Sequence, residues 1–217
     1  MENKINLIWS LDISTTNVGS ALWDSSGRLI ELKHLELKLK KSDEEDVENR
    51  DIRKAIMFAQ YCSDYKHRVE NELFGNIVKI FVEAPLQDTP KNINTTALLL
   101  GFNGMARLVL YQIFNIMPDK ITVHDARKSM LVDLVHAVRK KDKMVDVLSF
   151  PKDVDKKHYI WEKVSKLEPQ INWFYGNKGN FKTINYDMSD SYVVGIAGLI
   201  KSHIISKDDW KNKYSKI

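Results

Sequence analysis

The chain has 217 residues, of which 43% are hydrophobic, and its formal net charge is +4. This composition excludes a disordered chain and fits one domain with a sizeable core, while so small a charge does not by itself indicate a nucleic-acid partner. The single cysteine, Cys62, excludes an intramolecular disulfide and a cysteine-based zinc cluster, and no apolar run suggests a membrane span, so we expect a cytoplasmic protein with no membrane partner.

Three strands are expected first along the chain. Residues 5–12 form an apolar run, 18–23 form a second, and 28–39 alternate between polar and apolar side chains. Turn-forming residues at 14–17 and 24–27 separate them. Short turns between successive strands predict antiparallel pairing.

Helices and strands then alternate. Helical spacing covers 46–73, and a largely apolar helix is expected over 92–116. A nearly continuous apolar run at 77–83 predicts a strand buried on both faces, and 120–124 predicts another. The sequence therefore predicts an α/β fold with a five-stranded mixed sheet, its first three strands antiparallel, flanked by helices.

The last part of the chain predicts further helices. An amphipathic helical pattern covers 126–148, and helices are expected over 158–167 and 187–204. An aromatic-rich loop at 169–186 precedes the last helix, and the tail at 206–217 is polar. No repeat or Pro/Gly-rich linker interrupts the sequence, so residues 1–217 are interpreted as a single domain.

Four carboxylates occupy positions where burial of an ionised side chain costs free energy. Asp12 and Glu83 end apolar strands, and Asp187 and Asp190, three residues apart, face the same way at the start of the last helix. If that helix packs on the first strand, all four meet. Oxygen-rich clusters bind Mg²⁺ or Mn²⁺, and two such ions can activate water and stabilise the leaving oxygen of a phosphodiester.

Each acid also has an ordinary structural interpretation. Asp12 is acceptable as a turn residue, Asp187 as a helix N-cap and Asp190 as a first-turn acid favoured by the helix dipole. Glu83 fits such an interpretation least, because a glutamate that closes an apolar strand rarely has a structural reason. The four positions together favour a metal site.

At this point the chain resembles a known family, the RuvC-type Holliday junction resolvases of the ribonuclease H-like superfamily, and within it the divergent phage-type and virus-type members. The matching segments are Leu11-Asp12-Ile13-Ser14 with Gly19, Val82-Glu83-Ala84-Pro85, Asn94-Thr95-Thr96-Ala97-Leu98-Leu99-Leu100-Gly101 with Gly104, and Asp187-Met188-Ser189-Asp190-Ser191. They occur in the family's order and span nearly the whole chain.

The resemblance implies a ribonuclease H-like fold and a metal-dependent, structure-selective endonuclease that resolves Holliday junctions or other branched DNA. It implies that Asp12, Glu83, Asp187 and Asp190 ligate two Mg²⁺ ions, for which Mn²⁺ can substitute. Because resolvases cut two opposed strands, it also implies a homodimer, formed through the apolar helix at 95–116.

The family further has a basic residue after the fifth strand and a lysine at the start of a later helix. Arg127 or Lys128 fits the first, and Lys156 or Lys157 the second, with Lys157 the candidate that assists catalysis. A lysine there can bind the scissile phosphate or position water. Each of these residues is equally acceptable as a solvated surface charge.

The chain departs from the family at two places. Residues near 129–153 form an insertion, expected to be helical, and Leu86 stands where bacterial members place an aromatic that stacks on junction bases. The segment 173–182, which includes Lys178 and Lys182, mixes aromatics with basic residues and is a candidate DNA contact. Alternatively, its aromatics anchor the loop to the core.

A second basic segment, Arg139-Lys140-Lys141-Asp142-Lys143, is interpreted as a solvated helix face that contacts DNA only if it projects beside the site.

The sequence is also compatible with other functions. Within the same mechanism, the target can be an RNA–DNA hybrid, a replication fork or a flap. Asp12-Ile13-Ser14-Thr15-Thr16 with Gly19 and Asp24 also resembles the first phosphate loop of sugar kinases and actin-like ATPases, but we find neither the second phosphate motif nor the adenosine loop. A non-catalytic nucleic-acid-binding module is disfavoured because all four acids are present.

Overall fold

The computed structural model describes residues 4–39, 47–85, 93–141 and 143–217. Its main sheet has five strands in the order β3-β2-β1-β4-β5. The strands are β1 (Ile5–Ile13), β2 (Asn17–Asp24), β3 (Leu29–Glu36), β4 (Gly75–Ala84) and β5 (Asp119–Thr122). β1, β2 and β3 pair antiparallel, whereas β4 is parallel to both β1 and β5. The predicted mixed sheet and its antiparallel start are confirmed.

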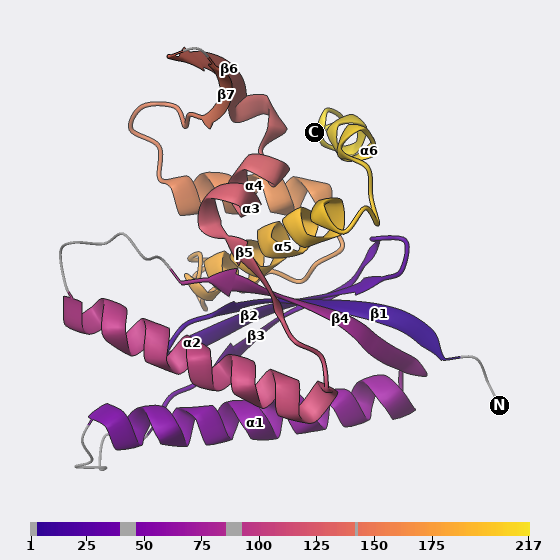
Figure 1. Ribbon diagram of the computed structural model, residues 1–217, viewed down its shortest axis with the longest axis vertical. Helices are drawn as coiled ribbons and strands as arrows, with labels where there is room; N and C mark the ends of the chain where they lie inside the picture. Colours follow the sequence, from indigo (N-terminus) through magenta and orange to yellow (C-terminus); the bar gives the residue numbers. More distant parts are fainter. Residues whose placement is uncertain (1–3, 40–46, 86–92, 142) are drawn as a thin grey trace.

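Helices cover both faces of the sheet (Figure 1). One face carries the two long helices α1 (Val47–Asn71) and α2 (Ile93–Phe114), and the other carries α3 (Val123–Met130), α4 (Lys156–Leu167), α5 (Ile184–Lys201) and α6 (Lys207–Tyr214). Because side chains alternate along each strand, two cores form. Trp9 lies in the core beneath α1, and Trp23 lies in the core beneath α5.

α5 packs directly on the sheet. A side chain added at Gly195 would meet the ring of Trp23, and one added at Gly198 would meet the ring of Phe81. The Ser10 hydroxyl donates to the Ser191 carbonyl at 2.9 Å and accepts from the Trp23 indole at 2.9 Å. These contacts fix the helix against β1, β2 and β4.

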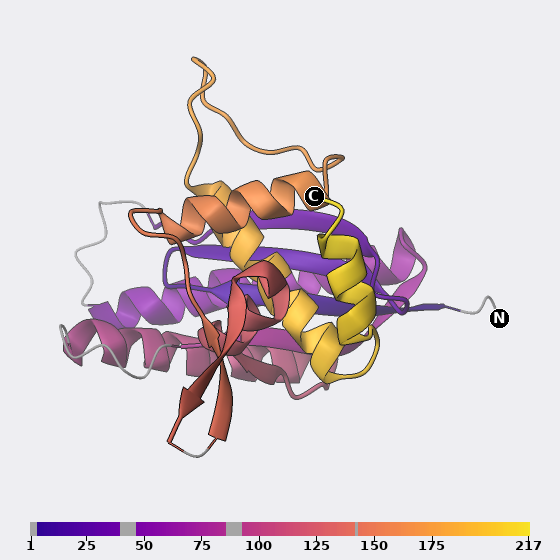
Figure 2. The ribbon, with the colours of Figure 1, turned by 90° about the horizontal axis from the view of Figure 1, so that it is seen from above.

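The segment after α3 differs from the prediction. A short 3₁₀ turn, η1 (Val132–Leu134), leads into a two-stranded hairpin of β6 (Val135–Lys140) and β7 (Lys143–Leu148). The predicted helix over 126–148 is therefore wrong beyond Met130, and the insertion near 129–153 contains a β-hairpin rather than a helix. Figures 1 and 2 show this hairpin projecting from the body of the protein.

Two properties of the hairpin explain why the sequence did not predict it. Its apolar residues also satisfy helical spacing, which periodicity alone cannot resolve. Lys141, which follows β6, has a φ of 53° in the left-handed region that asparagine and glycine usually occupy. A lysine at this position gives no turn signal in the sequence.

The polar tail contains a docked helix. In α6, Trp210 and Tyr214 lie four residues apart on one face and are buried in the core beneath α5. The Trp210 indole donates to the Met130 carbonyl at 3.1 Å. The C-terminal segment thereby holds the end of α3.

One face of α2 remains uncovered. Its buried side chains, Phe102, Ala106 and Leu110, contact α1 and the sheet core, whereas Leu108 and Tyr111 are 56% and 43% exposed. By length and composition the stretch Thr96–Phe114 could cross a membrane, with 22% of it buried, but the core contacts make this weak evidence for a span.

Candidate active site

The two strand carboxylates come from adjacent parallel strands. Leu11 of β1 pairs with Val82 of β4, so Asp12 and Glu83, one residue further along each strand, lie at the same edge of the sheet. Asp187 and Asp190 come from the first turns of α5. Gly19, the partner of Asp12 in β2, lies against the Asp187 backbone, so the start of α5 brings its two carboxylates to the same edge.

Gly19 allows α5 to reach this edge. It pairs with Asp12 across β1 and β2, and a Cβ atom built on it would lie 1.8 Å from the Asp187 carbonyl oxygen. Any side chain at this position would push the start of α5, with both of its carboxylates, away from Asp12. The glycine in the first motif is therefore explained by close approach of two backbones.

Burial and mutual repulsion disfavour the charged forms of these acids. Burial, followed by Glu83, Asp190 and Asp187, raises the pKa of Asp12 well above its usual range. Burial and then Asp190 raise the pKa of Glu83 to about 7, and burial with a smaller contribution from Asp190 raises that of Asp187 to about 6. Burial also raises the pKa of Asp190. The cluster therefore lacks sufficient positive charge of its own.

Two basic side chains partly offset this charge. The Lys157 ammonium lies 3.2 Å from Asp190 Oδ2. Burial alone would lower the pKa of Lys157, but Asp190 and Asp12 raise it on balance, so the lysine is charged. Arg127 lowers the pKa values of both Glu83 and Asp190.

The structure shows which member of each pair of basic candidates reaches the acids. Lys157 points at the acids from the start of α4, where Asp155 caps the helix by accepting from the Lys157 amide at 2.9 Å. Lys156 instead lies over the Phe150 ring, 5.6 Å from its centroid. Lys128 lines a separate pocket of about 330 Å³ between α3, α5 and α6. Arg127 and Lys157 are thus the two that join the cluster.

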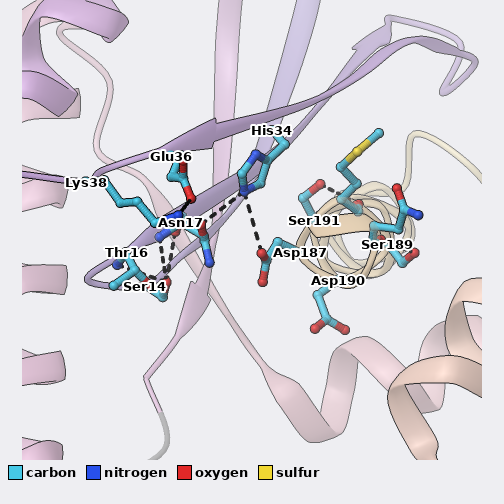
Figure 3. A network of polar contacts seen from close by, with 12 residues as sticks. Ser14, Thr16, Asn17, His34, Glu36, Lys38, Asp187, Ser189, Asp190 and Ser191 are labelled. Carbon is cyan, nitrogen blue, oxygen red and sulfur yellow. Dashed lines mark hydrogen bonds and ion pairs between the residues drawn. The ribbon is translucent and has the colours of Figure 1, made fainter. Parts of the chain in front are cut away.

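One polar neighbour of the cluster was not predicted. His34 pairs with Gly19 across β2 and β3, and its Nε2 lies 3.2 Å from Asn17 Oδ1 and 3.7 Å from Asp187 Oδ2 (Figure 3). Burial lowers the pKa of His34, so the ring is neutral at pH 7 and the longer contact is polar rather than ionic. The sequence does not reveal this neighbour, because its position depends on the strand register that places Asp12, Gly19 and His34 in one row across the sheet.

The structure gives no direct contact between the acids and the remaining DNA-binding candidates that it describes, Lys178 and Lys182. Leu86 falls outside the described residues. Lys178 and Lys182 are exposed on the loop before α5, which projects on the opposite side from the β6–β7 hairpin in Figure 2. Within this loop Phe181 packs on Trp161 with ring centroids 4.6 Å apart, so this aromatic anchors the loop to α4.

The donor set of the cluster suits a hard divalent cation, because it consists of carboxylate oxygens with raised pKa values and incomplete charge compensation. Across the described ranges, no group of three His, Cys, Asp or Glu side chains already adopts a metal-holding geometry. Figure 3 shows Asp187 directed at His34 and Asp190 directed elsewhere. Metal binding would therefore require these side chains to reorient.

Comparison with known proteins adds evidence about the fold. No family model and no curated protein matches the sequence. Two structures of Thermus thermophilus RuvC each align over 91% of this chain and 95% of their own length at 9% identity. The one in complex with a Holliday junction substrate gives a TM-score of 0.53, and the other gives 0.50. A Thermus thermophilus ROK hexokinase covers 60% of this chain and 39% of its own, with 16% identity and a TM-score of 0.35.

At 9% identity the likeness to RuvC concerns the fold. The chain shares with these RuvC structures a fold built on a five-stranded mixed sheet with flanking helices. A fold of this kind can host different activities, so function depends on the carboxylate cluster and its neighbours.

Proposed function

We propose that this protein is a metal-dependent, structure-selective endodeoxyribonuclease that hydrolyses phosphodiester bonds in branched DNA, with Holliday junctions as the expected substrate. The observation that carries the proposal is the gathering of Asp12, Glu83, Asp187 and Asp190 at one sheet edge of a RuvC-like fold. Such a substrate implies that the protein acts inside the cell.

The four carboxylates would hold two Mg²⁺ ions, with Mn²⁺ as a substitute. When bound, the ions would supply charge neutralisation at the phosphate and an activated water, which is the chemistry of two-metal hydrolysis. The acids' raised pKa values support this assignment, since added positive charge would favour their ionised forms.

The chain's own residues divide the remaining tasks. Lys157 has a side chain that is 49% exposed while its ammonium reaches Asp190, so it can contact the scissile phosphate from the solvent side of the cluster. Arg127 adds positive charge beside Glu83 and Asp190. His34 would restrict the orientation of Asp187, a positioning role of the kind that supports metal ligands elsewhere.

Further DNA contacts would come from residues outside the cluster. Lys178 and Lys182 lie on the loop that leads into α5, and Lys156 lies beside Lys157 at the start of α4. Phosphate contacts by exposed lysines position a nucleic acid without reading its sequence.

A homodimer formed through α2 would allow two opposed strands to be cut. The exposed face of α2 contains Leu100, Gly104, Leu108 and Tyr111, which follow helical spacing. A Cβ atom at Gly101 or Gly104 would meet nothing within 4 Å, so neither glycine is needed for packing within the described part of the protomer. Exposed glycines weaken a helix, and close approach of a second copy would explain them.

A panel of labelled DNA substrates tests the proposed substrate class. The wild-type protein should cleave a four-way junction with Mg²⁺ much faster than a linear duplex of the same sequence, leaving a 5′-phosphate and a 3′-hydroxyl. Faster cleavage of a flap or an RNA–DNA hybrid would contradict the assignment to junctions. Nucleotide hydrolysis without any DNA cleavage would contradict the nuclease itself and favour the kinase-like alternative.

A further inference from the structure

The β6–β7 hairpin is exposed along most of its length. Of the described residues in it, only Val135, Val138, Val147 and Leu148 are partly buried. Met144 is 65% exposed and Val145 is 39% exposed. An isolated two-stranded hairpin has little stability of its own, so its shape must be maintained from its base.

The base of the hairpin is held by polar contacts to two helices. Asp133 accepts hydrogen bonds from Tyr214 at 2.7 Å, from Lys163 at 3.1 Å and from Tyr159 at 3.3 Å. At the other strand, Phe150 packs edge-on against Tyr159 with ring centroids 5.9 Å apart. The hairpin is therefore an arm with a fixed base on α4 and α6.

The tip of the arm carries lysines at positions where the fold disfavours them. Lys140 lies directly opposite Lys143 in the ladder, and like charges in that arrangement repel. Lys141 occupies the left-handed region at φ 53°, which is unfavourable for a residue other than glycine. Asparagine or glycine would form the same turn more readily. The lysines do not serve the stability of the hairpin, which points to a ligand for their charge.

The arm lies between two cluster-bearing helices along the chain, and its size suits duplex DNA. It connects α3, which carries Arg127, to α4, which carries Lys157, so it belongs to the segment that supplies both basic residues of the carboxylate cluster. Strands of this length extend about 20 Å at roughly 3.3 Å per residue. The major groove of duplex DNA is about 12 Å wide and admits a two-stranded ribbon.

We propose that the β6–β7 hairpin is a DNA-holding arm, whose basic tip residues Arg139, Lys140, Lys141 and Lys143 contact the phosphate backbone along a groove of one duplex arm of the branched substrate. The proposal rests on the proposed function for the identity of the substrate. It assigns a DNA contact to the insertion, and it follows from charge complementarity between the exposed tip and DNA phosphates.

The test compares a tip variant, Lys140→Gln/Lys141→Asn/Lys143→Gln, with a control that removes equal charge elsewhere, Lys4→Gln/Lys120→Gln/Lys166→Gln. Binding of a labelled four-way junction is measured from 50 to 200 mM salt, with Ca²⁺ in place of Mg²⁺ to prevent turnover. The tip variant should bind roughly 10-fold or more weakly, and its salt slope should fall by about 0.9 for each lost phosphate contact. The control should bind like the wild type.

Misfolding does not confound this test, because the tip substitutions relieve repulsion and backbone strain, so the melting temperature should stay constant or rise. Equal affinity and salt slope for tip variant and wild type would overturn the arm proposal, as would equal losses in the control. Cleavage of the same junction by the wild type with Mg²⁺ is measured in parallel. If the wild type binds through the arm but cleaves nothing, the arm stands and the proposed nuclease fails.

Discussion

Asp12 sits among three other carboxylates, Glu83, Asp187 and Asp190, with Lys157 as the basic group that lowers its pKa. In the metal-free protein this arrangement costs stability, since like charges repel and burial disfavours each charged form. We therefore expect the residues of the proposed reaction to lower the free energy of unfolding when no metal is bound.

Replacing Asp12 by asparagine should change activity and stability in opposite directions. Loss of one carboxylate ligand should reduce junction cleavage by about 10³-fold or more, whereas loss of a repelled charge should raise the melting temperature of the metal-free protein by roughly 3 °C or more. Both quantities are measured on the same preparation.

Asp24→Asn is the matched control. Burial opposes ionisation of this acid, but hydrogen bonds from Ser26 and Arg28 in the β2–β3 turn lower its pKa overall. Its replacement should lower the melting temperature and leave cleavage unchanged. A less stable Asp12→Asn protein would contradict the view that the cluster is strained by its own charge.

The raised pKa values also predict how stability depends on pH. Between about pH 4, where unfolded carboxyls titrate, and pH 7, where folded Glu83 titrates, the folded chain binds more protons than the unfolded chain. The free energy of unfolding should therefore fall as the pH rises through this window. The decrease should be smaller in Glu83→Gln and should be reduced by saturating Mg²⁺.

Urea unfolding at pH 5 and pH 8 in the presence of a chelator measures the effect. Identical pH dependence in wild type and Glu83→Gln would show that Glu83 does not carry an elevated pKa.

Among the secondary-structure elements, the sheet strands were predictable and the hairpin was not. Four of the sheet strands, β1 to β4, are apolar or alternating runs that end at a turn or next to Pro85, and this pattern is readable without tertiary information. The β6–β7 hairpin lacks such a pattern because Lys141 occupies its turn. Helix α6 was missed because only Trp210 and Tyr214 are apolar enough to mark its buried face.

The buried face of α6 predicts a large effect of Trp210→Ala. Trp210 is 2% exposed and its indole donates to the Met130 carbonyl, so truncation leaves a cavity and an unpaired buried acceptor. The free energy of unfolding should fall by about 3–5 kcal/mol, as for other buried aromatics. Lys211→Ala, an exposed neighbour on the same helix, should change it by less than about 0.5 kcal/mol. Similar values for both variants, measured by urea unfolding, would contradict docking of α6.

For the molecule as a whole, the order of elements was enough to predict the sheet, and the sheet brings Asp12 and Glu83 to one edge. The sequence could not predict the row of Asp12, Gly19 and His34, because that row depends on strand register. Nor could it decide between Arg127 and Lys128 or between Lys156 and Lys157, because neighbouring residues on a helix point in different directions.

The proposed homodimer through α2 predicts the effect of Leu108→Glu. A charge placed on the exposed face should convert a dimer into a monomer without unfolding it, because Leu108 is 56% exposed in the protomer. Phe74→Asp, which alters a 60% exposed residue in the turn before β4, should leave the dimer intact. Light scattering after size-exclusion chromatography reports the mass. A wild-type monomer at micromolar concentration would exclude this interface, and detergent-dependent solubility would favour a membrane instead.

In the proposed function, the four acids form the catalytic centre of a metal-dependent nuclease. The most direct test is the single-turnover rate of four-way-junction cleavage with Mg²⁺ for the wild type, Asp190→Asn and the control Asp24→Asn. We expect the wild type and Asp24→Asn to cleave at similar rates, and Asp190→Asn to cleave at least about 10³-fold more slowly. Cleavage by Asp190→Asn at the wild-type rate, or no cleavage by the wild type, would contradict it.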